Sequence, residues 1–326
     1  MHIAYFGSPV LSAKLLRNLL DQYQLPISFI ATQQDKPVGH HLKVEPTPVK
    51  IVGLEHDIDV FDEPLNSVNS KRLRQELSGR AIDLCIVFAY GKILSQDLLS
   101  QVKHGFWNVH PSLLPRYRGP TPTVFPIILG DVATGTTLIQ MNAQMDEGDI
   151  LAQNEIQINP NELREDIEER LIMLAGEQIQ TSLESLSSGI LTPRPQHHAH
   201  ATYTPLLSRE DGFIEEVFIQ KALCNKQISE NELPGIFQRY FAKNNIHVKQ
   251  TRSSRSTLQS LFRALMPWPG LWTSVQIAGK IKRLKLLKIS FEDKEGSPFI
   301  QTVQLEGKKP VEFNVFCKAY NYFQQK

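Results

Sequence analysis

Three polar residues in two short segments are spaced so that they could do chemistry together. Asn108 and His110 lie at the end of an expected strand, whose alternation points both side chains to the same side. A histidine titrates near neutrality and can move a proton, and an asparagine amide can donate a hydrogen bond. Asp146, in the acidic loop at 140–149, could orient the histidine and favour its cation. Taken singly, each has a simpler interpretation as a turn or structural residue.

The elements that must position these residues alternate short apolar runs with helical periodicity. Strands are expected at 2–7, 27–32, 59–61, 83–90, 106–110 and 136–142, and amphipathic helices after Pro9 and Pro160. The strand at 83–90 is apolar almost throughout, which is typical of a parallel sheet covered on both faces. The alternation predicts a doubly wound, mostly parallel, Rossmann-like α/β domain over residues 1–186. Ligands of such sheets bind at the carboxyl edge of the strands, where 108 and 110 are expected.

The remainder of the chain has a different character. Residues 187–203 mix Ser, Gly, Pro and His with little periodicity and are predicted to be a linker. Three histidines there, at 197, 198 and 200, could bind a metal, but no carboxylate or thiol stands beside them, and a solvated linker is favoured. Residues 204–326 are predicted to form a smaller β-barrel of the five-stranded oligonucleotide-binding (OB-like) type. Its expected strands are 272–277, 282–290, 299–305 and 311–316, with an extra helix or two within 220–257.

Composition and charge narrow the class of protein. The 326 residues suit two domains, and the net charge of +1 hides an asymmetry. Residues 1–200 hold 16 Lys and Arg against 23 Asp and Glu, whereas residues 201–326 hold 19 against 11. A basic second half suggests a polyanionic partner, with a solvated basic face as the alternative. The three cysteines show no paired spacing, and neither a signal peptide nor a membrane span is evident, so a cytoplasmic protein without a metal is expected.

The two polar segments resemble the folate-dependent formyltransferases, and most closely the branch that acts on tRNA. The family pattern Asn-x-His-x-Ser-Leu-Leu-Pro, followed by Arg-x-Arg-Gly, matches residues 108–119. The downstream pattern Gln-Met-(x)4-Asp-x-Gly-Asp matches residues 140–149. With gaps, the resemblance covers nearly the whole chain, through blocks at 6–9, 34–50, 88–94, 202–212, 261–270 and 307–310.

The resemblance implies transfer of a formyl group from 10-formyltetrahydrofolate to the amino group of initiator methionyl-tRNA, in translation initiation. Such a transfer passes through a tetrahedral intermediate with an oxyanion, to which Asn108 and His110 could donate hydrogen bonds. His110 would also move the proton, and Asp146 would orient it. The resemblance further implies that the folate is held largely by backbone groups, at Phe88, Ala89, Tyr90, Gly91, Ser112, Leu113, Leu114, Pro115, Gln140 and Met141.

The resemblance also implies a set of tRNA contacts and a monomeric enzyme. The expected contacts are basic or histidine side chains, namely Lys36, His40, Lys43, Arg116, Arg118, Lys280, Lys282, Arg283 and Lys285. The chain departs from the tRNA-acting pattern in the loop at 33–50, where His40 and Leu42 stand at positions that are often Arg and Lys. Each lost charge should weaken phosphate contact modestly. Pro111 is more common in the purine-synthesis branch, which normally lacks a basic second domain.

Other classes of protein remain as alternatives. A sugar-nucleotide N-formyltransferase also carries a barrel-like second domain, although the loop at 46–50 (PTPVK) and the basic second half favour tRNA. A non-catalytic RNA-binding protein on the same fold is disfavoured by the intact residues 108, 110 and 146. A nicotinamide-dependent dehydrogenase is disfavoured because FGSPVLS at 6–12 lacks the GxGxxG that binds a pyrophosphate.

Overall fold

A computed structural model describes residues 1–38, 43–247, 251–292 and 299–323. The chain divides into two compact units. The first contains residues 1–118, 134–156 and 168–201, and the second contains residues 119–133, 157–167 and 202–326. The units therefore interleave along the chain, and the first includes most of the expected linker. The division of the sequence at 186 and 204 stays a prediction.

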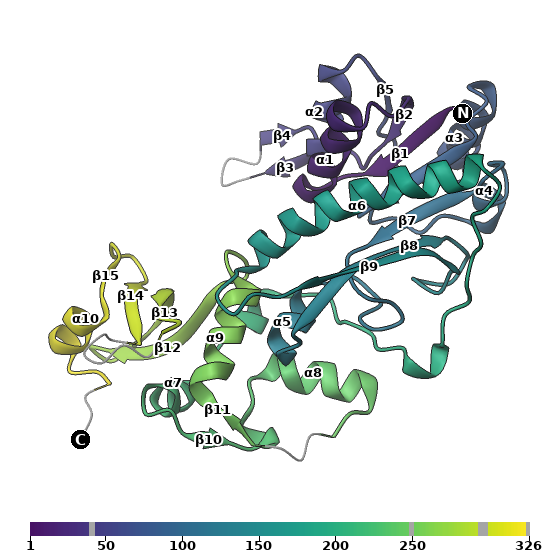
Figure 1. Cartoon of the computed structure of the whole chain (residues 1–326). Coiled ribbons are helices and arrows are strands. Elements are labelled where there is room, and N and C mark those ends of the chain that lie inside the picture. The colour runs from purple at the N-terminus through teal and green to yellow at the C-terminus, as the bar shows by residue number, and fades with distance from the viewer. Residues whose placement is uncertain (39–42, 248–250, 293–298, 324–326) are drawn as a thin grey trace. The chain divides into compact units, whose positions relative to one another are not determined.

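The first unit is built on a seven-stranded sheet with the order β5-β2-β1-β6-β7-β8-β9 (Figure 1). The strands are β1 (Ile3–Gly7), β2 (Ile27–Ala31), β5 (Asp59–Phe61), β6 (Leu84–Phe88), β7 (Phe106–His110), β8 (Ala133–Gln140) and β9 (Ile150–Gln157). The strands from β5 to β7 pair in parallel, and β8 pairs antiparallel to β7. The predicted doubly wound, mostly parallel α/β fold is confirmed.

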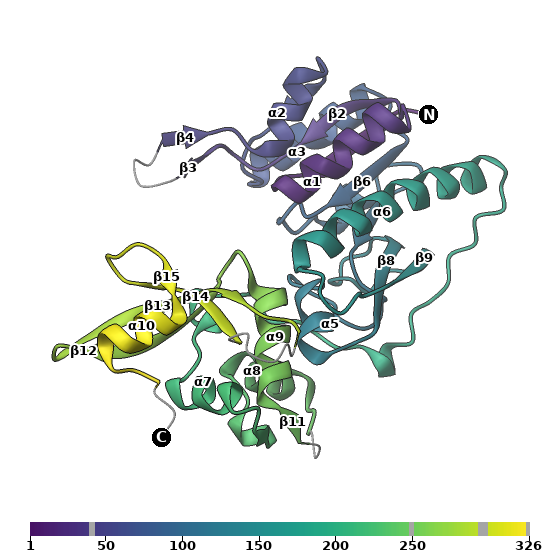
Figure 2. The same cartoon turned by 60° about the vertical axis from the view of Figure 1, so that its left-hand side comes forward.

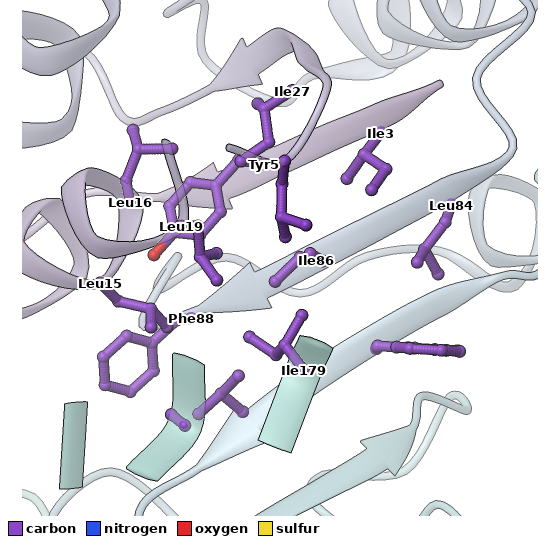
Figure 3. Packing of buried hydrophobic residues seen from close by; sticks show 14 of the residues in the cluster. Ile3, Tyr5, Leu15, Leu16, Leu19, Ile27, Leu84, Ile86, Phe88 and Ile179 are labelled. Carbon is purple, nitrogen blue, oxygen red and sulfur yellow. The ribbon is translucent and has the colours of Figure 1, made fainter. Parts of the chain in front are cut away.

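Both faces of this sheet are covered, as the apolar pattern at 83–90 predicts. On one face, Tyr5 and Ile86 belong to a core with α1 (Val10–Arg17), α2 (Pro48–Glu55) and α6 (Arg164–Ser187), part of which Figure 3 shows. On the other face, Phe6 and Cys85 pack with α3 (Ser67–Gly79) and α4 (Gln96–Leu99). Neighbouring residues of one strand thus pack into the cores on opposite sides of the sheet, because successive strand side chains point to opposite faces. A short π-helix, η1 (Asn18–Gln22), continues α1.

A hairpin of β3 (Lys36–Val38) and β4 (Lys43–Glu45) projects from the loop after β2. His40 and Leu42, which distinguish this loop from the tRNA-acting pattern, lie outside the described residues. Lys50, at the start of α2, donates to the carboxylates of Asp35 and Asp62 at 2.7 and 2.6 Å. Hydrogen bonding to these two carboxylates raises the pKa of Lys50, so its positive charge is already compensated within the protein.

The second unit contains a four-stranded antiparallel sheet with the order β12-β13-β14-β15. Its strands are β12 (Leu271–Ile277), β13 (Lys280–Ile289), β14 (Ile300–Leu305) and β15 (Val311–Glu312). The expected strand at 311–316 is wrong beyond Glu312, because α10 (Phe313–Tyr320) begins there and packs along β14 and β15 (Figure 2). Phe313 and Phe316 are three residues apart and both buried, a helical spacing that overrides their strand propensity.

The rest of the second unit is mainly helical. It holds α5 (Val124–Leu129), η3 (Arg209–Gly212), α7 (Glu216–Leu223), β10 (Gln227–Ile228), η4 (Glu230–Glu232), α8 (Gly235–Asn244), β11 (Arg252–Ser253) and α9 (Ser254–Leu265). The expected helices within 220–257 are therefore present. Tyr240 of α8 stacks on Phe125 of α5, with ring centroids 4.6 Å apart. None of the helices in the described part of the chain is both long and apolar enough to span a membrane.

The end of α2 carries a pH-dependent contact. The His56 ring is hydrogen-bonded to Asp21 at 2.9 Å and to the carbonyl of Val52 at 3.0 Å. The bond to Asp21, and to a smaller extent the bond to Val52, raises the pKa of His56 above its ordinary value. The raised pKa means that the stabilisation is complete below about pH 6.5 and is lost as the pH rises through the folded pKa. We therefore expect Asp21→Asn to lower the free energy of unfolding by about 0.5 kcal/mol at pH 6. Urea unfolding at pH 6 and pH 9 checks this; a loss of equal size at both pH values contradicts it.

Candidate active site

Several loops meet at the carboxyl edge of the parallel strands. Ser8, after β1, accepts a hydrogen bond from the backbone NH of Gln33, after β2, at 3.1 Å. The Gln33 side chain donates to the carbonyl of Tyr90, after β6, at 2.7 Å. These bonds join three strand ends, and β7 places His110 at the same edge because it runs parallel to β6. The loops after β1, β2 and β6 are therefore connected by hydrogen bonds beside the end of β7.

The structure brings the three predicted catalytic side chains together. Asn108 and His110 come from β7, and Asp146 comes from the loop between β8 and β9. One carboxylate oxygen of Asp146 lies 3.6 Å from His110 Nδ1 and 3.5 Å from Asn108 Nδ2. The His110 side chain is nearly buried, and that of Asp146 is 14% exposed. Both separations are long for direct hydrogen bonds, and catalytic contacts of this kind commonly shorten when substrate binds.

The other nitrogen of the His110 ring fixes its orientation. Nε2 lies 3.0 Å from the carbonyl oxygen of Tyr117. Because a carbonyl can only accept, Nε2 must carry the proton when the imidazole is neutral. Nδ1 is then the atom that can gain a proton, and it is the atom that faces Asp146. The imidazolium formed in this way would be paired with a carboxylate.

The loop that carries Asp146 folds back sharply. β8 runs antiparallel to β7 and ends opposite Trp107, so the chain must return along β7 before Asp146 can reach His110. Gly148 makes this return possible, since a Cβ there would lie 1.8 Å from the carbonyl oxygen of Gln140. Asp146 itself has φ +56°, in the left-handed region.

One residue that contacts this loop was not expected from the sequence. Gln196, within the expected linker, is 5% exposed and donates from Nε2 to the carbonyls of Asp146 and Gly148, each at 2.8 Å. The composition of residues 187–203 predicts a solvated linker. A single glutamine in such a segment belongs to no sequence pattern that would predict its burial. The nearby η2 (His198–His200) is a single 3-10 turn.

Arg118 differs most from its expected role. It was predicted to contact tRNA, but its side chain is fully buried. The guanidinium donates to Gln196 Oε1 through Nη2 at 2.7 Å and through Nε at 3.2 Å, and to Glu147 at 2.9 Å. Its Nη2 also lies 3.0 Å from His198 Nδ1. A guanidinium enclosed in this way presents no surface to a phosphate, whereas Arg116 is exposed beside the ring of Tyr117.

The residues predicted to bind folate fall into two groups. Along β6 and the turn after it, Phe88 and Tyr90 have buried side chains, whereas Ala89 and Gly91 are exposed. Burial raises the pKa of Tyr90 to about 12, so its phenol stays neutral at physiological pH. Met141 packs against the same core cluster as Tyr90. This end of β6 therefore offers mainly backbone groups to a ligand.

The second group anchors the loop after His110. The Thr137 hydroxyl accepts from the backbone NH of Leu114 and donates to the carbonyl of Ser112. Ser112 and Leu114 are buried, Leu113 and Pro115 are partly buried, and the Gln140 amide points toward Gly105 at the other end of β7. The structure thus gives Ser112 and Leu114 packing roles and leaves the folate contacts of this group as a prediction.

In the second unit, the strand register divides the basic residues predicted to contact tRNA between the two faces of the sheet. Trp272 pairs with Lys285 and Ser274 with Arg283, so these four side chains share one face of the sheet. The Arg283 guanidinium lies 4.1 Å from the centre of the Trp272 ring. By the same register, Lys280 and Lys282 lie on the opposite face of the sheet, together with Leu284 and Leu286. In the first unit, Lys36 and Lys43 are exposed on the β3–β4 hairpin.

Among the described residues, metal-binding side chains do not gather in groups of three or more. The three residues predicted to be catalytic supply an amide, an imidazole and a carboxylate. Together these groups can donate hydrogen bonds to a developing oxyanion and move a proton.

Comparison with known proteins points to the same chemistry. A family model described as formyl transferase matches residues 1–183. The methionyl-tRNA formyltransferase of Thermotoga neapolitana is 37% identical over 235 residues, covering 72% of this chain and 74% of that protein. The methionyl-tRNA formyltransferase of Geobacter sulfurreducens is 32% identical and covers 95% of this chain and 90% of its own.

Solved structures with the same fold have lower identity. A sugar N-formyltransferase from Shewanella matches with a TM-score of 0.54 and 18% identity, over 90% of this chain and 99% of its own. HypX from Aquifex aeolicus, solved with tetrahydrofolic acid, matches with a TM-score of 0.55 and 14% identity, over 98% of this chain and 47% of its own. The family model and the curated relatives cover most of the chain, and the chain therefore belongs to the formyl transferase family, among the methionyl-tRNA formyltransferases.

Proposed function

We propose that this formyltransferase moves the formyl group of 10-formyltetrahydrofolate to the amino group of initiator methionyl-tRNA. The observation that carries the catalytic part is the single Asp146 oxygen that faces both the Asn108 amide and His110 Nδ1. The curated relatives, which align over most of their own length, support the choice of acceptor. On this view the protein acts in the cytoplasm, in translation initiation, as a monomer.

The proposed reaction begins with attack of the uncharged amine nitrogen on the formyl carbon. The new C–N bond gives a tetrahedral intermediate whose oxygen carries the negative charge. Asn108 Nδ2 donates a hydrogen bond to this oxygen, which stabilises it without forming a covalent intermediate on the protein. No serine or cysteine nucleophile is needed, because the acceptor supplies the attacking atom.

Proton movement completes the transfer. The amine nitrogen must lose a proton as it is acylated, and His110 Nδ1 is the ring atom positioned to accept it, since Nε2 is engaged by Tyr117. Asp146 stabilises the imidazolium by its negative charge. The same proton then passes to folate N10 as the C–N10 bond breaks, so the enzyme returns to its starting state. Tetrahydrofolate and the formylated aminoacyl-tRNA leave.

The folate is proposed to lie against the end of β6 and the loop before Asp146. The backbone of Phe88–Gly91 would supply hydrogen bonds to the pterin ring, and Met141 would provide an apolar contact. The exposure of Ala89 and Gly91 beside the buried ring of Tyr90 supports backbone recognition at this edge. Leu113, Pro115 and Gln140 remain candidate contacts from the resemblance alone.

The tRNA is proposed to contact the sheet of β12–β15, which would serve as the OB-like domain of this enzyme. Trp272, Arg283 and Lys285 share one face, and a ring beside cations suits a nucleic acid through stacking and phosphate attraction. Lys280 and Lys282 would contribute longer-range attraction from the other register face. In the first unit, Lys36, Lys43 and Arg116 are exposed and are proposed as further contacts.

The acceptor is tested directly with the purified protein and 10-formyltetrahydrofolate. Charged initiator tRNA, uncharged initiator tRNA and an amino-sugar nucleotide are compared as acceptors at one concentration. We expect formylation with methionyl-tRNA only. Turnover with the sugar nucleotide instead would keep the formyltransferase chemistry and refute the proposed acceptor.

The catalytic roles predict losses of turnover. His110→Ala and Asp146→Asn should abolish transfer, and Asn108→Ala should lower kcat by about 10²–10³-fold, because one oxyanion donor is removed. Steady-state kinetics with methionyl-tRNA and thermal unfolding of each variant provide the measurements. Folded variants that retain wild-type turnover refute these catalytic roles.

The proposed nucleic-acid face predicts a salt-dependent change in KM. Reversing two charges in Arg283→Glu/Lys285→Glu should raise KM for methionyl-tRNA by about tenfold or more and leave kcat largely unchanged, since phosphate contacts bind without taking part in the reaction. The same reversal at Lys280 and Lys282 is the matched comparison. Equal effects from the two pairs would mean that net charge, and not this face, attracts the tRNA.

A further inference from the structure

Arg118 and Gln196 form a buried polar pair that is hydrogen-bonded to the loop carrying Asp146. They are 0% and 5% exposed, and they come from segments far apart in the sequence. A buried guanidinium is costly unless its donors are satisfied. Its donors are directed to Gln196 Oε1 and Glu147, and Nη2 also lies 3.0 Å from His198 Nδ1. The proposed catalytic mechanism uses neither Arg118 nor Gln196, so their burial needs another explanation.

The hydrogen bonds of Gln196 can be made in only one orientation. Its Nε2 donates to two carbonyls, those of Asp146 and Gly148, while its Oε1 accepts twice from Arg118. Exchanging the amide oxygen and nitrogen would face an oxygen to two carbonyls and an NH2 to a guanidinium. Arg118 therefore orients the amide, and the amide holds the carbonyl groups of Asp146 and Gly148.

The loop held in this way has an unfavourable backbone conformation. Asp146 has φ +56°, which an L residue other than glycine seldom adopts without support from its surroundings. A hydrogen bond to the Asp146 carbonyl constrains the peptide from which the carboxylate projects. If this bond is lost, the loop can relax and carry the carboxylate away from His110 Nδ1.

Arg118 also follows the residue that holds the other side of the imidazole. Tyr117, with φ +64°, offers its carbonyl to His110 Nε2. Anchoring Arg118 between Gln196 and Glu147 therefore fixes the chain direction at Tyr117 as well. One buried arginine thus contributes to the contacts on both nitrogens of the ring.

We propose that Arg118 and Gln196 are positioning residues, which hold Asp146 and the Tyr117 carbonyl around His110, and that Arg118 makes no contact with tRNA. This inference rests on the catalytic roles in the proposed function. It assigns a role to the linker segment at 194–200, which orders the catalytic loop through Gln196. It also replaces the tRNA contact that the motif implied for Arg118.

Two variants test the proposal. Gln196→Glu keeps an acceptor for Arg118 and removes the donor to the two loop carbonyls. Arg118→Met keeps a side chain of similar length and removes the donors to Gln196. Arg116→Ala is the matched comparison, since Arg116 lies two residues away in the same loop and is exposed.

The kinetic readout separates positioning from tRNA binding. We expect Gln196→Glu and Arg118→Met to lower kcat by about 10–100-fold, because small misplacements of catalytic groups have effects of that size. KM for methionyl-tRNA and its salt dependence should stay within about twofold of wild type. Arg116→Ala should show the reverse pattern, with KM raised. An unchanged kcat in Gln196→Glu, or a salt-dependent rise in KM for Arg118→Met, overturns the proposal.

A structural readout is independent of turnover. In a crystal structure of Gln196→Glu, the Asp146 carboxylate should be displaced from His110 Nδ1 by about 1 Å or more, the scale at which catalytic alignment fails. Thermal unfolding identifies a variant that has merely lost its fold. If Arg118→Met has lost its fold, the structure of Gln196→Glu decides, and if Gln196→Glu has lost its fold, the kcat and KM of Arg118→Met decide. If wild-type protein transfers no formyl group, the proposed function fails. An unmoved carboxylate with active wild type refutes only the positioning roles.

Discussion

The contact between His110 Nε2 and the Tyr117 carbonyl is the constraint on which the proposed chemistry of this site depends. It settles which ring nitrogen holds the resident proton and leaves Nδ1 directed toward Asp146. A free imidazole could present either nitrogen and would have to be ordered at each turnover. Fixing one nitrogen with a backbone carbonyl supplies this order before the substrates arrive. The loop that carries Asp146 and the neighbouring strand ends are arranged around this oriented ring.

The fold supplies this constraint through the strand arrangement. Parallel β6 and β7 end at the same edge, so the end of β6 lies near His110. The antiparallel β8 takes the chain away from that edge, and the loop from 141 to 149 brings it back. In this return the backbone at Gly148 passes close to the Gln140 carbonyl, and Asp146 takes a left-handed backbone conformation that needs support from its surroundings. Part of that support comes from Gln196, roughly fifty positions along the chain.

The sequence predicts structure correctly where the signal is local. Strand alternation placed Asn108 and His110 on one side, and the apolar run at 83–90 indicated a strand buried on both faces. Both features depend on residues that are close together in the chain. The family motif added Asp146, whose approach to His110 depends on a loop return that no periodicity encodes.

Burial that depends on distant segments is not predicted by the local sequence. The motif predicts that Arg118 is an exposed basic residue. Its burial becomes evident only from the contacts with Gln196 and Glu147 in the folded structure. The segment after Glu312 illustrates a different error, since Phe313 and Phe316 have the propensity of strand residues but a spacing that suits a helix. The neighbouring strands β14 and β15 favour the helix. In both cases the tertiary environment decided between two locally acceptable structures.

The most direct test of the proposed proton transfer is the tautomer of His110 in the wild-type protein. Nitrogen-15 NMR of histidine-labelled protein, with His110→Ala to assign the signal, measures which ring nitrogen carries the proton when the imidazole is neutral. We predict a proton on Nε2 and an unprotonated Nδ1 facing Asp146. A neutral ring protonated on Nδ1 would contradict this mechanism, because Nδ1 could then not accept the proton released by the amine.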